Sequence, residues 1–140
     1  MIVVEIDIPG RAMPWHRPHD FKGRRLTSEA NRIAIGALKE LATRHMAGRR
    51  PVAGAVRLEV VCVYAIPAGW NAKQRAAALD ARAWHTARPD WDNLGKLISD
   101  ALNGIVYKDD CQIADGRVAK RYGQPERTMI RVTQIGDIYG

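Results

Sequence analysis

The segment from Val56 to Ile66 limits the fold of this chain more than any other part of its 140 residues. Its first half alternates apolar residues with Arg57 and Glu59, which is the period-two pattern of a strand that buries one face. Its second half, around Val61 and Val63, is apolar on both sides, which is typical of a strand buried on both faces. We therefore expect a central strand here, and a central strand requires neighbouring strands and covering helices.

Other segments carry the patterns of neighbouring strands. Residues 2–8 alternate with a period of two until Pro9-Gly10 ends the run. Two further strands are expected over about residues 112–121 and 128–135, and residues 105–107 are expected to form a short strand. Together these segments predict a small mixed β-sheet.

Three segments show the spacing or the capping residues of helices. The first follows a cap at Thr27 or Ser28 and extends to Gly48, and the second follows a cap at Asn71 and ends near Ala81. The third has an apolar stripe at helical spacing and stops at Asn103-Gly104. The members of this stripe are Leu94, Leu97, Ile98, Ala101 and Leu102.

The length of the chain predicts one domain. It is long enough for a single hydrophobic core and too short for two independent ones. Hydrophobic residues make up 46% and charged residues 26%, as in ordinary globular proteins. We expect an α/β fold of the α+β type, in which helices flank the small mixed sheet and residues 136–140 form a loose tail.

The chain is strongly basic. It has 22 Lys and Arg residues against 15 Asp and Glu residues, a net charge of +7, and its arginines outnumber its lysines. Arginine grips phosphate oxygens in two places, so this composition favours a nucleic-acid partner. Many cations gather in residues 11–25, which form either a solvated loop or an arm that binds phosphate. The DNA-binding candidates in this segment are Arg11, His16, Arg17, Arg24 and Arg25.

The cysteines and the apolar runs indicate a cytoplasmic protein. Cys62 and Cys111 lie far apart with no Cys-x-x-Cys pair, so neither a zinc ribbon nor a disulfide framework is indicated. The N-terminus lacks the pattern of a signal peptide, and no run reaches the roughly twenty apolar residues that span a bilayer. We therefore expect no contact with a membrane.

Four aspartates stand out against this basic background: Asp90, Asp92, Asp109 and Asp110. Residues two apart in an extended segment point the same way, so Asp90 and Asp92 are expected to converge. Carboxylates repel phosphate unless a divalent cation lies between them, and such oxygen ligands suit Mg²⁺ or Mn²⁺ better than zinc. We therefore expect a metal-dependent nuclease, whose ion activates water and stabilises the leaving oxygen.

Two residues near these acids have two interpretations each. Lys96 lies four residues after Asp92, on the helix face opposite the apolar stripe. It forms either an ordinary salt bridge or a contact with the scissile phosphate. His85 is either a neighbour of the metal or the phosphate, or an ordinary surface histidine. Asp92 or Asn93, near the helix start, could be nothing more than a cap, although capping does not explain Asp90, Asp109 and Asp110.

The region from Arg88 onward resembles the motifs of a known nuclease family. Its three motifs are Arg88-Pro89-Asp90-Trp91-Asp92-Asn93-Leu94-Gly95-Lys96, Asp100-Ala101-Leu102-Asn103-Gly104 and Asp109-Asp110-Cys111-Gln112-Ile113. This combination is similar to the RusA family of Holliday junction resolvases. The likeness extends to the basic residues 10–18 and to residues 118–122, whereas residues 22–82 match only in the order of elements.

The resemblance implies a homodimeric endonuclease of mixed α/β fold. Such enzymes bind four-way DNA junctions and, with Mg²⁺ or Mn²⁺, nick two opposed strands symmetrically during recombination and repair. The resemblance also implies that Asp90, Asp92 and Asp110 bind the metal and that Lys96 is the catalytic lysine. Asp109 is a less direct ligand on the same grounds.

The resemblance has two consequences outside the acidic residues. Arg88 and Lys120 join the DNA-binding candidates. Trp91 and Gly95 depart from the residues that family members commonly carry at these positions, which are small or branched at the first and larger at the second.

Other functions stay open on the sequence. The chain could be a non-catalytic accessory protein that binds junctions or other branched DNA, with acids that are purely structural. It could also be a nuclease that acts on other branched DNA or on RNA. In each case we expect a bacterial or phage-encoded protein of the cytoplasm.

Overall fold

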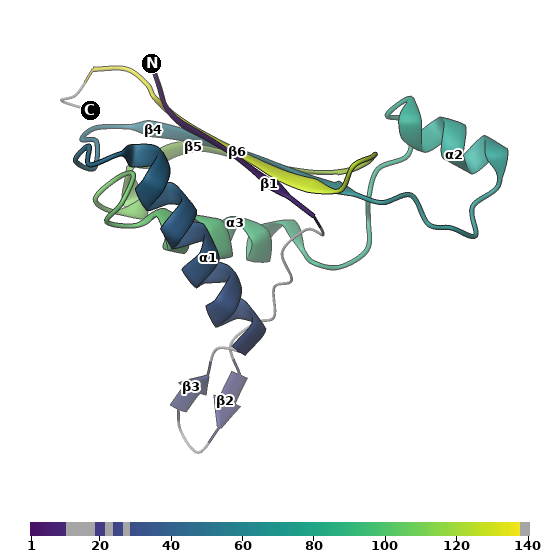
Figure 1. The fold of residues 1–140 in the computed structure, drawn as a ribbon, viewed down its shortest axis with the longest axis horizontal. Coiled ribbons are helices and arrows are strands. Elements are labelled where there is room, and N and C mark those ends of the chain that lie inside the picture. Colours follow the sequence, from purple (N-terminus) through teal and green to yellow (C-terminus); the bar gives the residue numbers. More distant parts are fainter. Residues whose placement is uncertain (11–18, 22–23, 27–28, 138–140) are drawn as a thin grey trace.

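A four-stranded mixed β-sheet forms the centre of the molecule (Figure 1). The computed structural model describes residues 1–10, 19–21, 24–26 and 29–137, with the backbone alone for residues 19–21 and 24–26. The strands of the sheet are β1 (Ile2–Pro9), β4 (Val56–Tyr64), β5 (Ile113–Tyr122) and β6 (Arg127–Gln134).

The strand order is β1-β6-β4-β5, so β4 lies inside the sheet with a partner on each side. It runs antiparallel to β6 and parallel to β5, and β1 runs antiparallel to β6. The predicted central strand is therefore confirmed, although it ends at Tyr64 rather than Ile66. A mixed sheet with helices also confirms the predicted α+β fold class.

Two helices cover one face of this sheet, and a third lies beyond its end (Figure 1). The covering helices are α1 (Glu29–Met46) and α3 (Trp91–Leu102), which pack against each other. The third helix is α2 (Ala72–Leu79), and its predicted cap is confirmed. The Asn71 side chain accepts a hydrogen bond from the Gln74 N–H, and the Gln74 side chain accepts one from the Asn71 N–H, each 2.9 Å long.

The hydrophobic core lies between the covering helices and the sheet. All five residues of the predicted α3 stripe have no exposed surface: Leu94, Leu97, Ile98, Ala101 and Leu102. Helix α1 contributes Leu38, Ala42 and Met46 to the same cluster. Full burial of one large apolar side chain contributes about 1.5–3 kcal/mol, so this stripe fixes which face of α3 points outward.

The predicted short strand at residues 105–107 is wrong, because residues 104–106 form a turn and Tyr107 makes isolated bridges to Val52 and Asn103. The N–H groups of Ile105 and Val106 both donate to the Leu102 carbonyl, at 3.1 and 3.0 Å, and the Gly104 N–H donates to Tyr107. The last carbonyls of a helix need partners, and the residues directly after α3 supply them. Gly104 has a φ of +76°, which glycine adopts at little cost.

The basic loop expected over residues 11–25 is also corrected in part. Strands β2 (His19–Phe21) and β3 (Arg24–Leu26) pair as an antiparallel hairpin. Two short runs separated by two residues that include a glycine suit such a hairpin. The rest of the expected loop lies outside the described residues, as do the caps predicted at Thr27 or Ser28 and most of the predicted tail.

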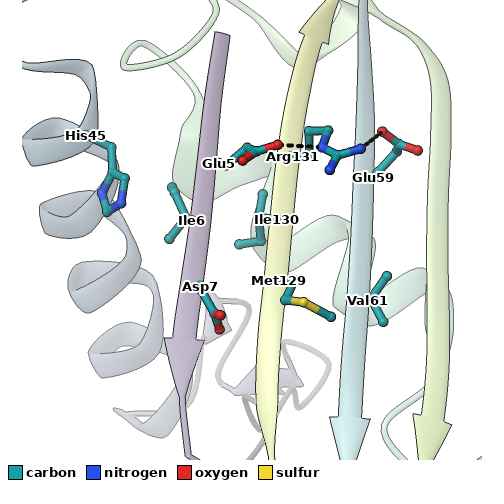
Figure 2. Close-up of a pocket in the computed structure, with 9 residues that line it drawn as sticks. All are labelled: Glu5, Ile6, Asp7, His45, Glu59, Val61, Met129, Ile130 and Arg131. Carbon is teal, nitrogen blue, oxygen red and sulfur yellow. Dashed lines mark hydrogen bonds and ion pairs between the residues drawn. The ribbon is translucent and has the colours of Figure 1, made fainter. Parts of the chain in front are cut away.

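The sheet face opposite α1 and α3 carries ion pairs that join neighbouring strands. Arg131 of β6 lies between Glu5 of β1 and Glu59 of β4, at N–O distances of 2.9 and 4.0 Å (Figure 2). Arg57 of β4 pairs with Asp115 of β5 at 2.7 Å. Exposed ion pairs of this kind contribute about 0.2–1 kcal/mol each. They therefore help to fix the register of the strands, but they do not stabilise this face as a layer of helices would.

Candidate active site

Asp90 occupies the N-cap position, directly before α3, but its side chain makes no hydrogen bond to the N–H groups of the helix. Its backbone is extended, with φ −70° and ψ 147°, and the helix begins at Trp91. The prediction that the extended segment reaches Asp92 is therefore wrong by one residue. Asp92 lies in the first helical turn, where the helix dipole stabilises a negative charge. The capping alternative does not account for the Asp90 carboxylate.

An open hollow of about 420 Å³ brings part of the predicted site together. It is lined by Asp90, Trp91, Asp92 and Lys120. The first three come from the start of α3 and Lys120 comes from β5. Both of the acids predicted to converge therefore face the same space, next to a cation from a distant part of the chain.

Lys120 also fixes the loop that leads to Asp90. Its ammonium group donates to the carbonyl oxygens of Ala87 and Pro89, at 2.6 and 2.8 Å. Two hydrogen bonds from one charged donor hold the end of this loop against β5. Lys120, which was predicted to bind DNA, therefore has a positioning role that the sequence did not indicate.

A second group of charged residues follows the outward face of α3. Lys96 pairs with Asp100, with the Nζ and Oδ1 atoms 3.1 Å apart. The two side chains are 63% and 36% exposed, so the pair contributes only about 0.3–0.5 kcal/mol. Lys96 therefore forms an ordinary salt bridge, but the partner here is Asp100, whereas the sequence interpretation named Asp92. So weak a pair leaves the ammonium group available to a phosphate, and that contact stays a prediction.

Asp100 is the charged residue of this site that sequence reasoning missed. It lies four residues after Lys96 and eight after Asp92, and this helical spacing could have placed it on the same face. Its charge also acts on Asp110, which lies in the segment after α3. Asp100 therefore links the α3 face to the second acidic motif.

The second acidic motif is held by a short 3-10 helix, η1 (Asp110–Gln112). The Asp109 carboxylate caps η1 by accepting a hydrogen bond of 3.2 Å from the Cys111 N–H. The Gln112 side chain accepts a hydrogen bond of 3.0 Å from the Asp109 N–H. Capping accounts for the Asp109 carboxylate, so the expectation that capping would not explain this acid is wrong. Its assignment as the less direct ligand of the two stays a prediction.

The surroundings of the Asp109 and Asp110 carboxyl groups shift their pKa values in opposite directions. Burial raises the pKa of Asp110, and the hydrogen bond and charge of Asp109 and the charge of Asp100 raise it further, while Lys96 opposes them. The Cys111 N–H lowers the pKa of Asp109. Asp110 therefore lies in a negative environment that a divalent cation would relieve.

The donor groups suit Mg²⁺ in type, but they do not form a complete cage. Among the described residues, no three His, Cys, Asp or Glu side chains lie close enough together to hold a metal ion. Mg²⁺ is commonly held by one or two carboxylates together with water and substrate phosphate, so Asp90 and Asp92 fit it. The convergence of Asp110 on the same ion stays a prediction.

The His85 ring packs against two aromatic side chains. It stacks on Tyr64, with ring centroids 3.7 Å apart, and meets the edge of Tyr122 at 5.3 Å. Burial lowers its pKa, and the charge of Lys120 lowers it further. Neutral imidazole is therefore favoured here, and a role beside the metal or the phosphate stays a prediction.

The other predicted DNA-binding residues are described only in part. Arg88 is exposed in the loop before Asp90. Arg24 and Arg25 belong to β3, for which the backbone alone is described. Three candidates lie outside the described residues: Arg11, His16 and Arg17.

Comparison with known proteins shows the class and then the family of the chain. The family model for endodeoxyribonuclease RusA matches residues 9–133. The chain therefore belongs to a family of endodeoxyribonucleases. That family is the RusA family, which confirms the resemblance noted in the sequence.

One curated relative shares a shorter stretch. The chain is 40% identical over 50 residues to the uncharacterized protein YqaN of Bacillus subtilis (strain 168). This match covers 36% of the chain and 35% of YqaN, so the chain spans about a third of that relative.

Within the described part of the chain, no helix has the length and apolar character that crossing a membrane requires.

Proposed function

We propose that this protein is a Mg²⁺-dependent endonuclease that resolves four-way DNA junctions by paired symmetric nicks, in recombination and repair. The observation that carries the proposal is the hollow in which Asp90, Asp92 and Lys120 meet. The net charge of +7 supports DNA as the polyanion that approaches it. Membership of the RusA family supports the reaction class.

Asp90 and Asp92 would hold the ion, and Asp110 would join them when the phosphate of the substrate enters. When bound, Mg²⁺ supplies an activated water and neutralises charge on the scissile phosphate, and Mn²⁺ is expected to substitute. Lys96 leaves its exposed pair with Asp100 and donates to the same phosphate, where it stabilises developing negative charge.

A homodimer is part of the proposal. A four-way junction is approximately two-fold symmetric, so two subunits related by a two-fold axis would present two equivalent sites to two opposed strands. The described residues of one chain carry one such site. Light scattering of the purified protein is expected to give twice the mass of the chain.

Cleavage of a synthetic four-way junction tests the proposed function. The wild-type protein is expected to make two symmetric nicks with Mg²⁺ and none with a chelator, and to leave linear duplex intact. Asp92→Asn is expected to bind the junction but to cut at least about 100-fold more slowly, since even the partners around metal ligands matter about 10–100-fold. Asp80→Asn is the matched control, because Asp80 pairs with Arg82 at the end of α2.

Three outcomes would overturn the proposal. Equal cutting of junction and linear duplex would remove the claim of junction specificity. Cutting by Asp92→Asn at the wild-type rate would remove the metal assignment. Salt-sensitive binding without any product would instead favour a non-catalytic accessory protein.

A further inference from the structure

Trp91 is a largely exposed aromatic side chain inside the proposed active site. Its exposed fraction is 65%, although most tryptophans bury much of their surface. It lies between Asp90 and Asp92 in the sequence and lines the same hollow as both of them and Lys120. A ligand that enters this hollow therefore meets the indole together with the two carboxylates.

Other aromatic rings near this part of the sheet already have partners within the protein. Trp70 meets the edge of Tyr122 at 4.9 Å, and the Arg121 guanidinium lies 4.7 Å from the centre of the Trp84 ring. Within the part of the chain that the structure describes, no ring or guanidinium group stacks on Trp91. The indole is therefore available to a flat ligand.

The chemistry of the hollow selects the kind of ligand. Carboxylates with a divalent ion, and a lysine at the rim, attract a phosphate group. A phosphate held by an ion on Asp90 and Asp92 would carry nucleosides on both sides, and a base of one of them would meet the Trp91 side chain that lines the same hollow. Every base has a π-face, so stacking on an aromatic ring tolerates any sequence. A branch point suits this contact, because unstacking is easiest where pairing is already interrupted.

We propose that Trp91 is a stacking platform for a nucleobase next to the scissile phosphate, so that the active site engages an unstacked nucleotide at the branch point. The proposal rests on the proposed function for the substrate, and it adds a nucleobase-binding site to it. Base stacking on an aromatic ring corresponds to about a 5- to 150-fold difference in affinity.

A double-mutant cycle between protein and DNA tests the proposal. Junctions are prepared with an abasic site in place of each nucleotide that flanks the scissile phosphate. Binding is measured with Ca²⁺, and cleavage is measured with Mg²⁺. Trp91→Ala is expected to weaken binding of the intact junction by about 5- to 150-fold and to cause no further loss on one abasic junction. Trp91→Phe, which keeps a ring, is expected to retain most of the affinity.

Trp84→Ala is the matched control, because Trp84 is also exposed, at 46%, but packs on Arg121. Trp84→Ala is expected to change the affinity for intact and for abasic junctions by the same factor. Thermal unfolding of each variant shows that the fold is kept. A junction with 2-aminopurine at the responding position is expected to change its fluorescence with the wild type but not with Trp91→Ala.

The failures of the two proposals can be told apart. Normal cleavage with equal losses on intact and abasic junctions in Trp91→Ala would overturn the stacking platform alone. A change of oligomeric mass in Trp91→Ala would also overturn it, since the indole would then cover a subunit interface. Binding without cleavage by the wild type would overturn the proposed function and leave the binding cycle as the test of Trp91.

Discussion

Replacing Gln112 with alanine is expected to loosen the turn that carries the second acidic motif. The Gln112 side-chain oxygen accepts hydrogen bonds from the N–H groups of Lys108 and Asp109, at 2.8 and 3.0 Å. Its amide nitrogen donates to the carbonyl oxygens of Val52 and Gly54, both at 2.9 Å. One side chain therefore ties the turn before η1 to the segment that leads into β4, and Gln112→Ala removes all four bonds.

The expected loss of stability follows from the exposure of these bonds. The two bonds to Lys108 and Asp109 are exposed, so water replaces them at little cost, whereas the two to Val52 and Gly54 are partly buried. Each partly buried bond contributes about 1 kcal/mol, which gives a loss of about 2 kcal/mol. For a chain close to 150 residues, this lowers the melting temperature by about 4–8 °C.

Thermal unfolding followed by circular dichroism measures this loss, with Gln134→Ala as the matched control. The Gln134 amide donates one exposed hydrogen bond, to the Ala53 carbonyl at 2.6 Å, so its removal is expected to lower the melting temperature much less. A melting temperature of Gln112→Ala within about 1 °C of the wild type, or equal to that of Gln134→Ala, would refute the reasoning.

Two further predictions concern α3 and the cysteines. Gly95→Ala is expected to stabilise the protein by about 0.5–1 kcal/mol in urea unfolding, because glycine weakens a helix and an added Cβ would meet Val118 at an ordinary 3.5 Å. A lower midpoint would contradict this. One thiol per native chain is expected to react quickly with a thiol reagent, because Cys111 is exposed whereas burial raises the pKa of Cys62 to about 11. Two fast thiols would contradict this.

Periodic patterns predicted the parts of the fold that depend on burial. The α3 stripe is buried in the core and β4 lies inside the sheet, and both were predicted correctly. Val61 and Val63 are only partly buried, so the expectation that the second half of β4 is buried on both faces is wrong: α1 and α3 cover the other face of the sheet. Residues 105–107 have apolar, strand-forming side chains, but the N–H groups of Ile105 and Val106 donate to the Leu102 carbonyl at the end of α3, which makes this segment a turn. Local hydrogen bonding therefore overrode side-chain preference there.

The parts of the site that could not be predicted depend on contacts between distant segments. The bonds from Lys120 to Ala87 and Pro89 join residues more than thirty positions apart, and no pattern along the chain marks them. Asp90 occupies the N-cap position of α3, but its side chain makes no capping hydrogen bond. This too depends on backbone geometry that the sequence does not show. Asp100 is different, because helical spacing from Lys96 could have shown it.

Direct measurement of metal binding tests the proposed ion site most closely. Mn²⁺ is titrated into the protein with and without a junction, and the free ion is followed by electron paramagnetic resonance. Asp90→Asn, Asp92→Asn and Asp110→Asn are each expected to weaken binding by about tenfold or more, whereas Asp80→Asn is expected to bind as the wild type does. Binding of Mn²⁺ by all three site variants as tightly as by the wild type would contradict the site.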